Sequence, residues 1–188
     1  MHDEGTLIVS KQTIMIALRA CQHLPTQMEP DQILELVNAF YDVTVKKGIV
    51  SDVDIGGAFV SLLGKCGRID DAERIFSGLS AHDIPSWTKM MSAYIENGHP
   101  DKALQIFARI ERSDMSLDQH TIAVTIQACI MTLDLGDSTF LRKDIMLEIG
   151  RALHTKARKR HLVSNVFISS NLITMYGKCG HIIEAENL

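Results

Sequence analysis

Apolar residues recur every three to four positions through most of the chain, which is the spacing of one face of an α-helix. One such stripe comprises Phe59, Leu62, Leu63 and Cys66. Gly67 follows at a point where a helix end favours a residue that tolerates the left-handed conformation. A second stripe comprises Ala72, Ile75, Phe76 and Leu79. The pattern predicts a helix, a tight turn and a second helix.

The same pattern returns in the next stretch. Gly98 takes the place of Gly67, and Pro100 suits the first position of the helix that follows. The second stripe is matched one for one by Ala103, Ile106, Phe107 and Ile110. The phrases "DDAERIF" and "DKALQIF" therefore mark two copies of one helix-turn-helix unit.

Two longer phrases also occur twice, and each copy contains a cysteine. "GKCGRIDDAERIF" resembles "GKCGHIIEAENL", and "QTIMIALRAC" resembles "HTIAVTIQAC". A metal site and a structural repeat are the two interpretations. Zinc ligands usually come in close C-x-x-C pairs, and none of the cysteines is so placed: Cys21, Cys66, Cys129 and Cys179. We expect no metal site, and small, reduced cysteines packed inside the fold.

Matching points in these phrases divide the chain into repeat units at about 11–52, 53–83, 84–118, 119–165 and a truncated 166–188. A single unit of this kind cannot bury its own apolar stripes, so neighbouring units must stack. The predicted fold is all-α, a right-handed α-solenoid of about four and a half stacked helix-turn-helix repeats, with 1–188 forming a single array. The last unit stops within its expected second helix, so we expect a longer protein.

Composition narrows the class of function. The chain has 188 residues, 46% of them hydrophobic, and a formal net charge of −4. No apolar run approaches the roughly 18 residues that span a bilayer, so no membrane partner is expected. A strongly basic chain would indicate binding to nucleic acid. This chain is not strongly basic, so any contact with nucleic acid must come from local basic patches. No catalytic constellation and no glycine-rich phosphate loop is present, so we expect neither an enzyme nor a cofactor or small-molecule substrate.

In order, "GGAFVSLLGKCGRIDDAERIF", "PSWTKMMSAYIENGHPDKALQIF", "TIAVTIQAC…EIGRALH" and "SSNLITMYGKCGHIIEAENL" resemble pentatricopeptide repeats. More narrowly, they resemble the plant subclass in which short, ordinary and long repeats alternate. The resemblance covers nearly the whole chain. The two long repeats depart from the family because each is stretched, by "PTQMEP" and by "LDLGDSTFLRKD".

The resemblance implies binding of single-stranded RNA, at roughly one base per repeat, in a mitochondrion or chloroplast. Many members of this subclass direct RNA editing or other transcript processing, with editing or processing cofactors as further partners. The H-x-E and P-C-x-x-C zinc signature of nucleotide deaminases is absent. Another domain or partner would therefore supply the chemistry. The short, acidic N-terminus does not read as a transit peptide.

The resemblance also implies particular RNA-contacting residues. A base is read by a side chain early in the first helix and by the last residue of the repeat, here Thr88 and Asp118, a pair that implies guanine. Ser170 suits a purine. Lys65 and Lys178 stand where the family often places a phosphate-contacting lysine. The alternatives are a solvated helix residue for Thr88, a helix cap for Asp118, and cations favouring a helix C-terminus for the lysines.

Other positions leave two functions open. The family clamps each base between apolar second residues of adjacent repeats, which here are Gln12, Asp54, Pro85, His120 and Phe167. Of these, only Phe167 and Pro85 have apolar side chains that suit contact with a base. The basic run "RALHTKARKRH" is either a solvated face or a phosphate-binding edge. We expect Trp87 and His154 to be packing residues. The alternative function is a helical scaffold that binds a protein or peptide on its concave face.

Overall fold

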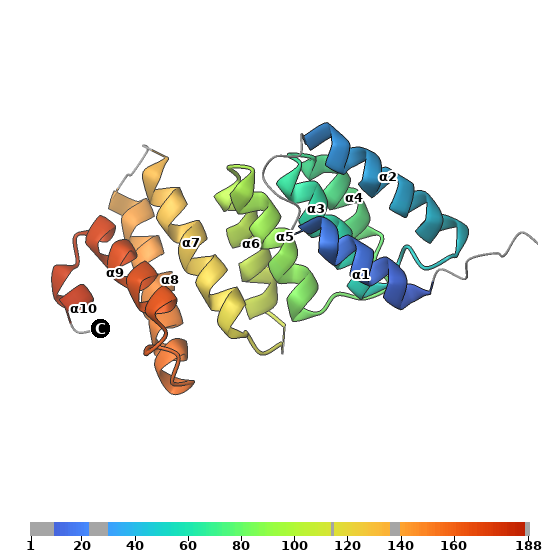
Figure 1. Ribbon diagram of the computed structural model, residues 1–188. Coiled ribbons are helices and arrows are strands. Elements are labelled where there is room, and N and C mark those ends of the chain that lie inside the picture. The colour runs from blue at the N-terminus through green and yellow to red at the C-terminus, as the bar shows by residue number, and fades with distance from the viewer. Residues whose placement is uncertain (1–9, 23–29, 114, 136–139, 187–188) are drawn as a thin grey trace, which may run out of the picture.

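The computed structural model describes residues 10–22, 30–113, 115–135 and 140–186, and within them the chain is helical throughout, without a strand (Figure 1). The helices are α1 (Lys11–Gln22), α2 (Pro30–Lys46), α3 (Val53–Lys65), α4 (Ile69–Ser77), α5 (Ile84–Glu96), α6 (Pro100–Glu111), α7 (Gln119–Asp134), α8 (Phe140–Lys159), α9 (Val166–Cys179) and α10 (Ile182–Glu186). The all-α prediction is confirmed. The two stretched segments lie partly outside the described residues.

The odd-numbered and even-numbered helices form two layers. Each odd helix contacts the next odd helix, in the order α1, α3, α5, α7 and α9. We call this row the first-helix layer. The even helices pack on it from one side, as α6 does against α5 and α7. The result is an elongated stack that progresses from α1 and α2 to α10 (Figure 1). The prediction of a helical-repeat solenoid is confirmed.

Left-handed glycines make the turns inside the helix pairs. Gly67, Gly98 and Gly180 have φ angles of 72°, 76° and 82°. After the first two, the chain is closed by bonds from Arg68 N to the Leu63 carbonyl at 2.9 Å and from His99 N to the Tyr94 carbonyl at 2.8 Å. Only glycine enters this conformation without strain. The turns predicted at Gly67 and Gly98 are confirmed, and α6 begins at Pro100 as expected.

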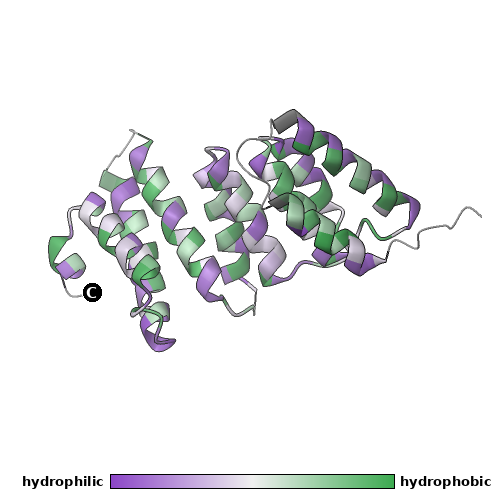
Figure 2. Ribbon diagram, viewed as in Figure 1, coloured by the Kyte–Doolittle hydropathy of each residue, from purple (hydrophilic) through white to green (hydrophobic). Residues whose placement is uncertain are grey.

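The apolar stripes face one another between neighbouring helices. Hydrophobic and hydrophilic residues are interspersed along the helices (Figure 2), and the central α3 and α7 are buried over most of their length. The largest fully buried side chains include Phe59, Leu62, Met90, Ile110, Ile126, Leu153 and Tyr176. Burying each stabilises the fold by about 1.5–3 kcal/mol. The core is therefore a continuous band along the stack.

Gly64 explains one of the repeated glycines. A Cβ atom at this position would lie 2.6 Å from Cβ of Ala93, so α3 and α5 approach more closely than any side chain would permit. The matching Gly177 in α9 has no atom within 4 Å of such a Cβ. Close helix packing therefore explains the glycine at position 64 but not the matching glycine at position 177.

The cysteines are free thiols. Burial raises the pKa of Cys129 to about 12, and burial also raises the pKa values of Cys21, Cys66 and Cys179. Thiols of this kind are poor nucleophiles. In the described residues, no three His, Cys, Asp or Glu side chains gather as a metal centre requires. No described helix is both long enough and apolar enough to cross a bilayer.

Candidate nucleic-acid interface

Four helices of the first-helix layer begin at a capping side chain. Asp52 caps α3, Asp83 caps α5, Asp118 caps α7 and Asn165 caps α9. Each side chain accepts hydrogen bonds from backbone N–H groups of the first turn, which would otherwise lack partners. The capping interpretation of Asp118 therefore holds, and the cap fixes where its carboxylate stands at the start of α7.

Thr88 is buried in the interface between α5 and α7, with an exposed fraction of 1%. It is not a solvated helix residue. Its hydroxyl oxygen lies 2.8 Å from the Ile84 carbonyl oxygen and 2.8 Å from Oγ1 of Thr121. Thr121 in turn donates its hydroxyl to Oδ1 of Asp118 at 2.7 Å, and its backbone N–H donates to the same oxygen at 2.7 Å. Thr121 thus connects Thr88 to Asp118.

The direction of these bonds follows from what each group can donate. A carboxylate only accepts, so the hydroxyl hydrogen of Thr121 points to Asp118. Oγ1 of Thr121 then accepts from Thr88, whose one hydroxyl hydrogen is shared with the Ile84 carbonyl. No described residue donates to Oδ2 of Asp118, which is an exposed side chain. That oxygen is the acceptor the network presents to solvent.

Thr121 is not among the residues that the repeat pattern singles out. The sequence indicates Thr121 only by its position, because the phrases "QTI" and "HTI" place Thr13 and Thr121 at the same point of two repeats. Thr13 is exposed, and its hydroxyl oxygen lies 3.0 Å from that of Ser10. Equal positions in the sequence therefore carry different contacts.

The remaining predicted contacts are more exposed. Ser170 lies on the surface of α9, and its hydroxyl donates to the Phe167 carbonyl at 3.1 Å. Lys178 forms an ion pair with Asp134 of α7. Lys65 is the last residue of α3. Desolvation raises the pKa of Glu96 on α5, and the positive charge of Lys65 acts in the opposite direction. Both lysines thus stand near a carboxylate of the adjacent first helix.

The five second residues, Gln12, Asp54, Pro85, His120 and Phe167, are all exposed on the first-helix layer. His120 and Phe167, whose side chain is 61% exposed, border a cavity of about 170 Å³ between α5, α7 and α9. Apolar side chains of Ile95, Ala123 and Val124 line it. Flat rings beside an apolar hollow suit stacking against a planar ligand.

Three cations of the basic run in and after α8 bond to other parts of the chain. Arg151 pairs with Glu184 of α10, Lys156 pairs with Glu111 of α6, and Arg160 donates to Ser116. Trp87 and His154, expected as packing residues, contact Phe76 at a 4.9 Å ring separation and Tyr176 at 5.9 Å, respectively. Much of the basic run therefore tethers α8 to its neighbours.

Comparison with known proteins gives a consistent result. The "PPR repeat" family matches residues 85–115, which cover α6 and all of α5 except its first residue. A putative pentatricopeptide repeat-containing protein of Arabidopsis thaliana is 30% identical over 92% of this chain and 24% of its own length. A chloroplastic pentatricopeptide repeat-containing protein of that plant is 32% identical over 95% of this chain and 26% of its own length.

A mitochondrial pentatricopeptide repeat-containing protein of Arabidopsis thaliana is 26% identical over 82% of this chain and 14% of its own length. The chain spans about a quarter of the length of the first of these relatives. The similarity extends over nearly the whole array and agrees with its paired helices and glycine turns. The chain belongs to the pentatricopeptide repeat family.

Proposed function

We propose that this chain is the RNA-binding part of a protein of organelle RNA metabolism, with the first-helix layer as its RNA surface. Pentatricopeptide repeats generally bind single-stranded RNA, one base per repeat. The observation that carries the proposal is the row of exposed second residues beside the capping carboxylate of Asp118. Relatives whose names read chloroplastic and mitochondrial support a mitochondrion or chloroplast as the location.

The lengths of the paired helices support the subclass with short, ordinary and long repeats. The second helices have 9 residues in α4, 12 in α6 and 20 in α8. The first helices have 13, 13 and 16 residues in α3, α5 and α7. This progression is the order short, ordinary, long. Transcript editing or processing is the proposed role, with another domain or a partner cofactor performing the chemistry.

Base reading is assigned to the ordinary repeat. One base lies between Pro85 and His120, with its polar edge at Asp118. Guanine presents two N–H donors on its Watson–Crick edge, and Oδ2 of Asp118 is an acceptor without a protein donor. Thr88 acts on Asp118 through the hydroxyl of Thr121. The pair therefore favours guanine.

The next base enters the cavity between His120 and Phe167. Its lining at Ala123 and Val124 is apolar, so stacking holds this base with little selectivity. Ser170 is assigned to a purine in the repeat that follows, because its hydroxyl is exposed. Lys65 and Lys178 are assigned to phosphates, with Lys178 exchanging Asp134 for the RNA backbone.

Fluorescence anisotropy with single-stranded RNAs that differ only at one base tests this function. We expect weak, salt-sensitive binding with a shallow slope, because few phosphates are contacted. Asp118→Asn keeps a capping oxygen and removes the charge, so it should abolish the guanine preference while leaving the melting temperature nearly unchanged. Asp83→Asn is the matched control, because it makes the same change in the cap of α5. Asp83 ends the preceding repeat, in which Gly57 stands at the position equivalent to Thr88.

The scaffold alternative rests on charge. Lys11 bonds to Asp52 at 2.7 Å and to Asp54 at 3.1 Å, and Lys178 pairs with Asp134, so two cations of the first-helix layer are neutralised by the protein itself. The net charge of −4 points the same way. Absence of RNA binding at low salt, with a folded wild-type protein, would reject the RNA proposal and favour a protein or peptide ligand.

A further inference from the structure

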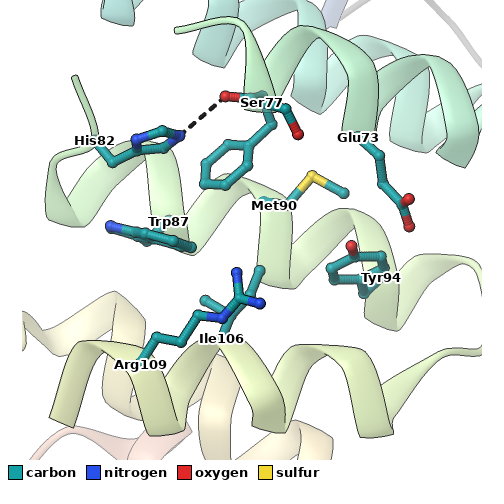
Figure 3. A pocket seen from close by; sticks show the side chains of 9 residues that line it. Glu73, Ser77, His82, Trp87, Met90, Tyr94, Ile106 and Arg109 are labelled. Atoms are coloured by element: carbon teal, nitrogen blue, oxygen red, sulfur yellow. Dashed lines mark hydrogen bonds between the residues drawn. The ribbon is translucent and has the colours of Figure 1, made fainter. Parts of the chain in front are cut away.

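The opposite side of α5 carries a second cavity. It lies between α4 and α6, has a volume of about 240 Å³, and is open to solvent (Figure 3). Its principal lining residues are Glu73, Phe76, His82, Trp87, Tyr94 and Arg109. Trp87 and Thr88 are consecutive, yet Trp87 packs on Phe76 of α4 whereas Thr88 bonds to Thr121 of α7. A ligand here would not occupy the proposed RNA surface.

Three rings form a rigid wall of this cavity. The ring centroids of Phe76 and Trp87 are 4.9 Å apart, and those of Phe76 and His82 are 4.5 Å apart. Nε2 of His82 lies 3.0 Å from the Phe76 carbonyl oxygen, so Nε2–H donates and fixes the imidazole (Figure 3). Nε1 of Trp87 is buried and has no acceptor among the described residues. A buried indole donor without an acceptor is uncommon, because most such groups are satisfied.

The acidic side of the cavity is internally neutralised. Lys102 Nζ lies 2.6 Å from Oε1 of Glu73, and burial together with the Glu73 carboxylate raises the pKa of Tyr94. Arg109 stands across the cavity from Tyr94, and its guanidinium reaches over Ile106 (Figure 3). Among the described residues no carboxylate forms an ion pair with Arg109. It is the cation that the cavity presents to a ligand.

The neighbouring cavity, between α2 and α4, can be compared with the α4–α6 cavity within the same chain. Its volume is about 250 Å³, but its arginines, Arg68 and Arg74, both pair with Asp71. It also has one aromatic residue, Tyr41, in place of the cluster of rings. The combination of an aromatic wall and an unpaired arginine therefore belongs to the α4–α6 cavity rather than to every repeat.

Size and charge select the ligand. The volume falls below the roughly 300–1,000 Å³ of small-molecule sites, and it suits a single large side chain. One cation without a partner matches one carboxylate, whereas nucleic-acid backbones are held by several cations together. Aromatic anchors in pockets contribute most of the binding energy of protein interfaces.

We propose that the α4–α6 cavity is a docking site for a partner protein, which inserts an aromatic side chain against Phe76 and Trp87. An acidic residue next to that side chain pairs with Arg109. The site lies on the face opposite Thr88, so the partner and RNA bind together. The inference does not depend on the RNA proposal, because the cavity is lined neither by the exposed second residues nor by Asp118.

Trp87 is the single tryptophan of the chain, so its fluorescence and its indole N–H resonance report on this cavity alone. The probes are the capped peptides Ala-Phe-Glu-Ala, Ala-Phe-Gln-Ala and Ala-Ala-Glu-Ala, and a single-stranded oligouridine. We expect saturable shifts of the indole resonance with the Phe-Glu peptide, and affinity weaker by about threefold or more for either substituted peptide.

Arg109→Gln should reduce affinity for the Phe-Glu peptide to that of the Phe-Gln peptide, without changing the melting temperature. Arg74→Gln is the matched control, and it should leave the peptide affinity unchanged. Equal affinity for the Phe-Glu and Phe-Gln peptides, or no shift with any peptide at millimolar concentration, would overturn the proposal. A shift with oligouridine that Arg109→Gln removes would assign the cavity to RNA instead.

Discussion

The hydroxyl oxygens of Thr88 and Thr121 lie 2.8 Å apart in a buried interface, and this contact joins the first helices of two adjacent repeats. Both side chains are essentially inaccessible, with exposed fractions of 1% and 0%. Because Thr121 also bonds to Asp118, the contact connects the packing of α5 on α7 to the cap of α7. Asp118, on the proposed RNA surface, is thus held by a polar link to the core.

Thr121→Val removes that link while preserving the shape of the side chain. We expect a loss of about 1–3 kcal/mol in the free energy of unfolding, because the Thr88 hydroxyl loses one partner and Asp118 loses a donor. Thr13→Val changes the equivalent exposed threonine and should alter stability by less than about 0.5 kcal/mol. Urea unfolding of the two variants compares them directly. Equal losses would show that the Thr88–Thr121 contact is not stabilising.

Gly64→Ala and Gly177→Ala test the two copies of the "GKCG" phrase. A Cβ at Gly64 would meet Cβ of Ala93 at 2.6 Å, so α3 and α5 must separate, and we expect destabilisation of about 1–3 kcal/mol. A Cβ at Gly177 meets nothing within 4 Å, and alanine is the better helix former by about 1 kcal/mol. Thermal unfolding should therefore move in opposite directions for the two variants.

His154 should make stability depend on pH. Burial, helped by the charge of Arg158, lowers the pKa of His154 below the ordinary histidine value of 6.5. The unfolded chain therefore binds a proton at a higher pH than the folded protein does. The stabilisation is complete above 6.5 and is lost as the pH falls through the folded pKa.

The measurement for His154 is the unfolding free energy between about pH 7.5 and pH 5 in wild type and in His154→Gln, the range set by a histidine reference pKa. The wild type should lose more stability on acidification than the variant. Parallel curves for the two proteins would refute the assignment. The variant also loses the contact of Nδ1 with the Tyr176 hydroxyl at 3.1 Å, which should change stability equally at every pH, so the difference in slope is the test.

The cysteines should behave as packing residues. Cys129 is fully buried and Cys66 is half-buried, so Cys129→Ala should cost more stability than Cys66→Ala or Cys179→Ala. Thiol alkylation of the native protein should be slowest at Cys129, because burial raises its pKa. Stoichiometric zinc in the wild type that Cys66→Ala or Cys179→Ala removed would contradict this role.

Local signals in the sequence are enough to predict the helices and their turns. The left-handed turns at Gly67 and Gly98 depend on a few neighbouring residues, and so does the cap at Asp118. The burial of Thr88 is not local, because it depends on where α7 packs, and Thr121 is 33 residues away. The pairing of Lys178 with Asp134, separated by 44 residues, has the same origin.

The α4–α6 cavity is harder still to predict from sequence. Its ring wall needs Phe76 from α4, His82 from the following loop and Trp87 from α5, and each of these alone reads as an ordinary packing residue. What distinguishes Arg109 is the lack of an ion pair in the described part of the chain, which no pattern of residue types can show. Sites of this kind appear only once the helices are placed in space.

Every contact between the described helices joins members of the same repeat or of adjacent repeats. Several of these junctions carry a surface ion pair, such as Lys102 with Glu73 or Lys156 with Glu111. A load applied along such an array is borne by each junction in series. A small change at each junction therefore adds up over the length of the array. Because added salt weakens surface ion pairs, we expect the stiffness of the array to fall as the ionic strength rises.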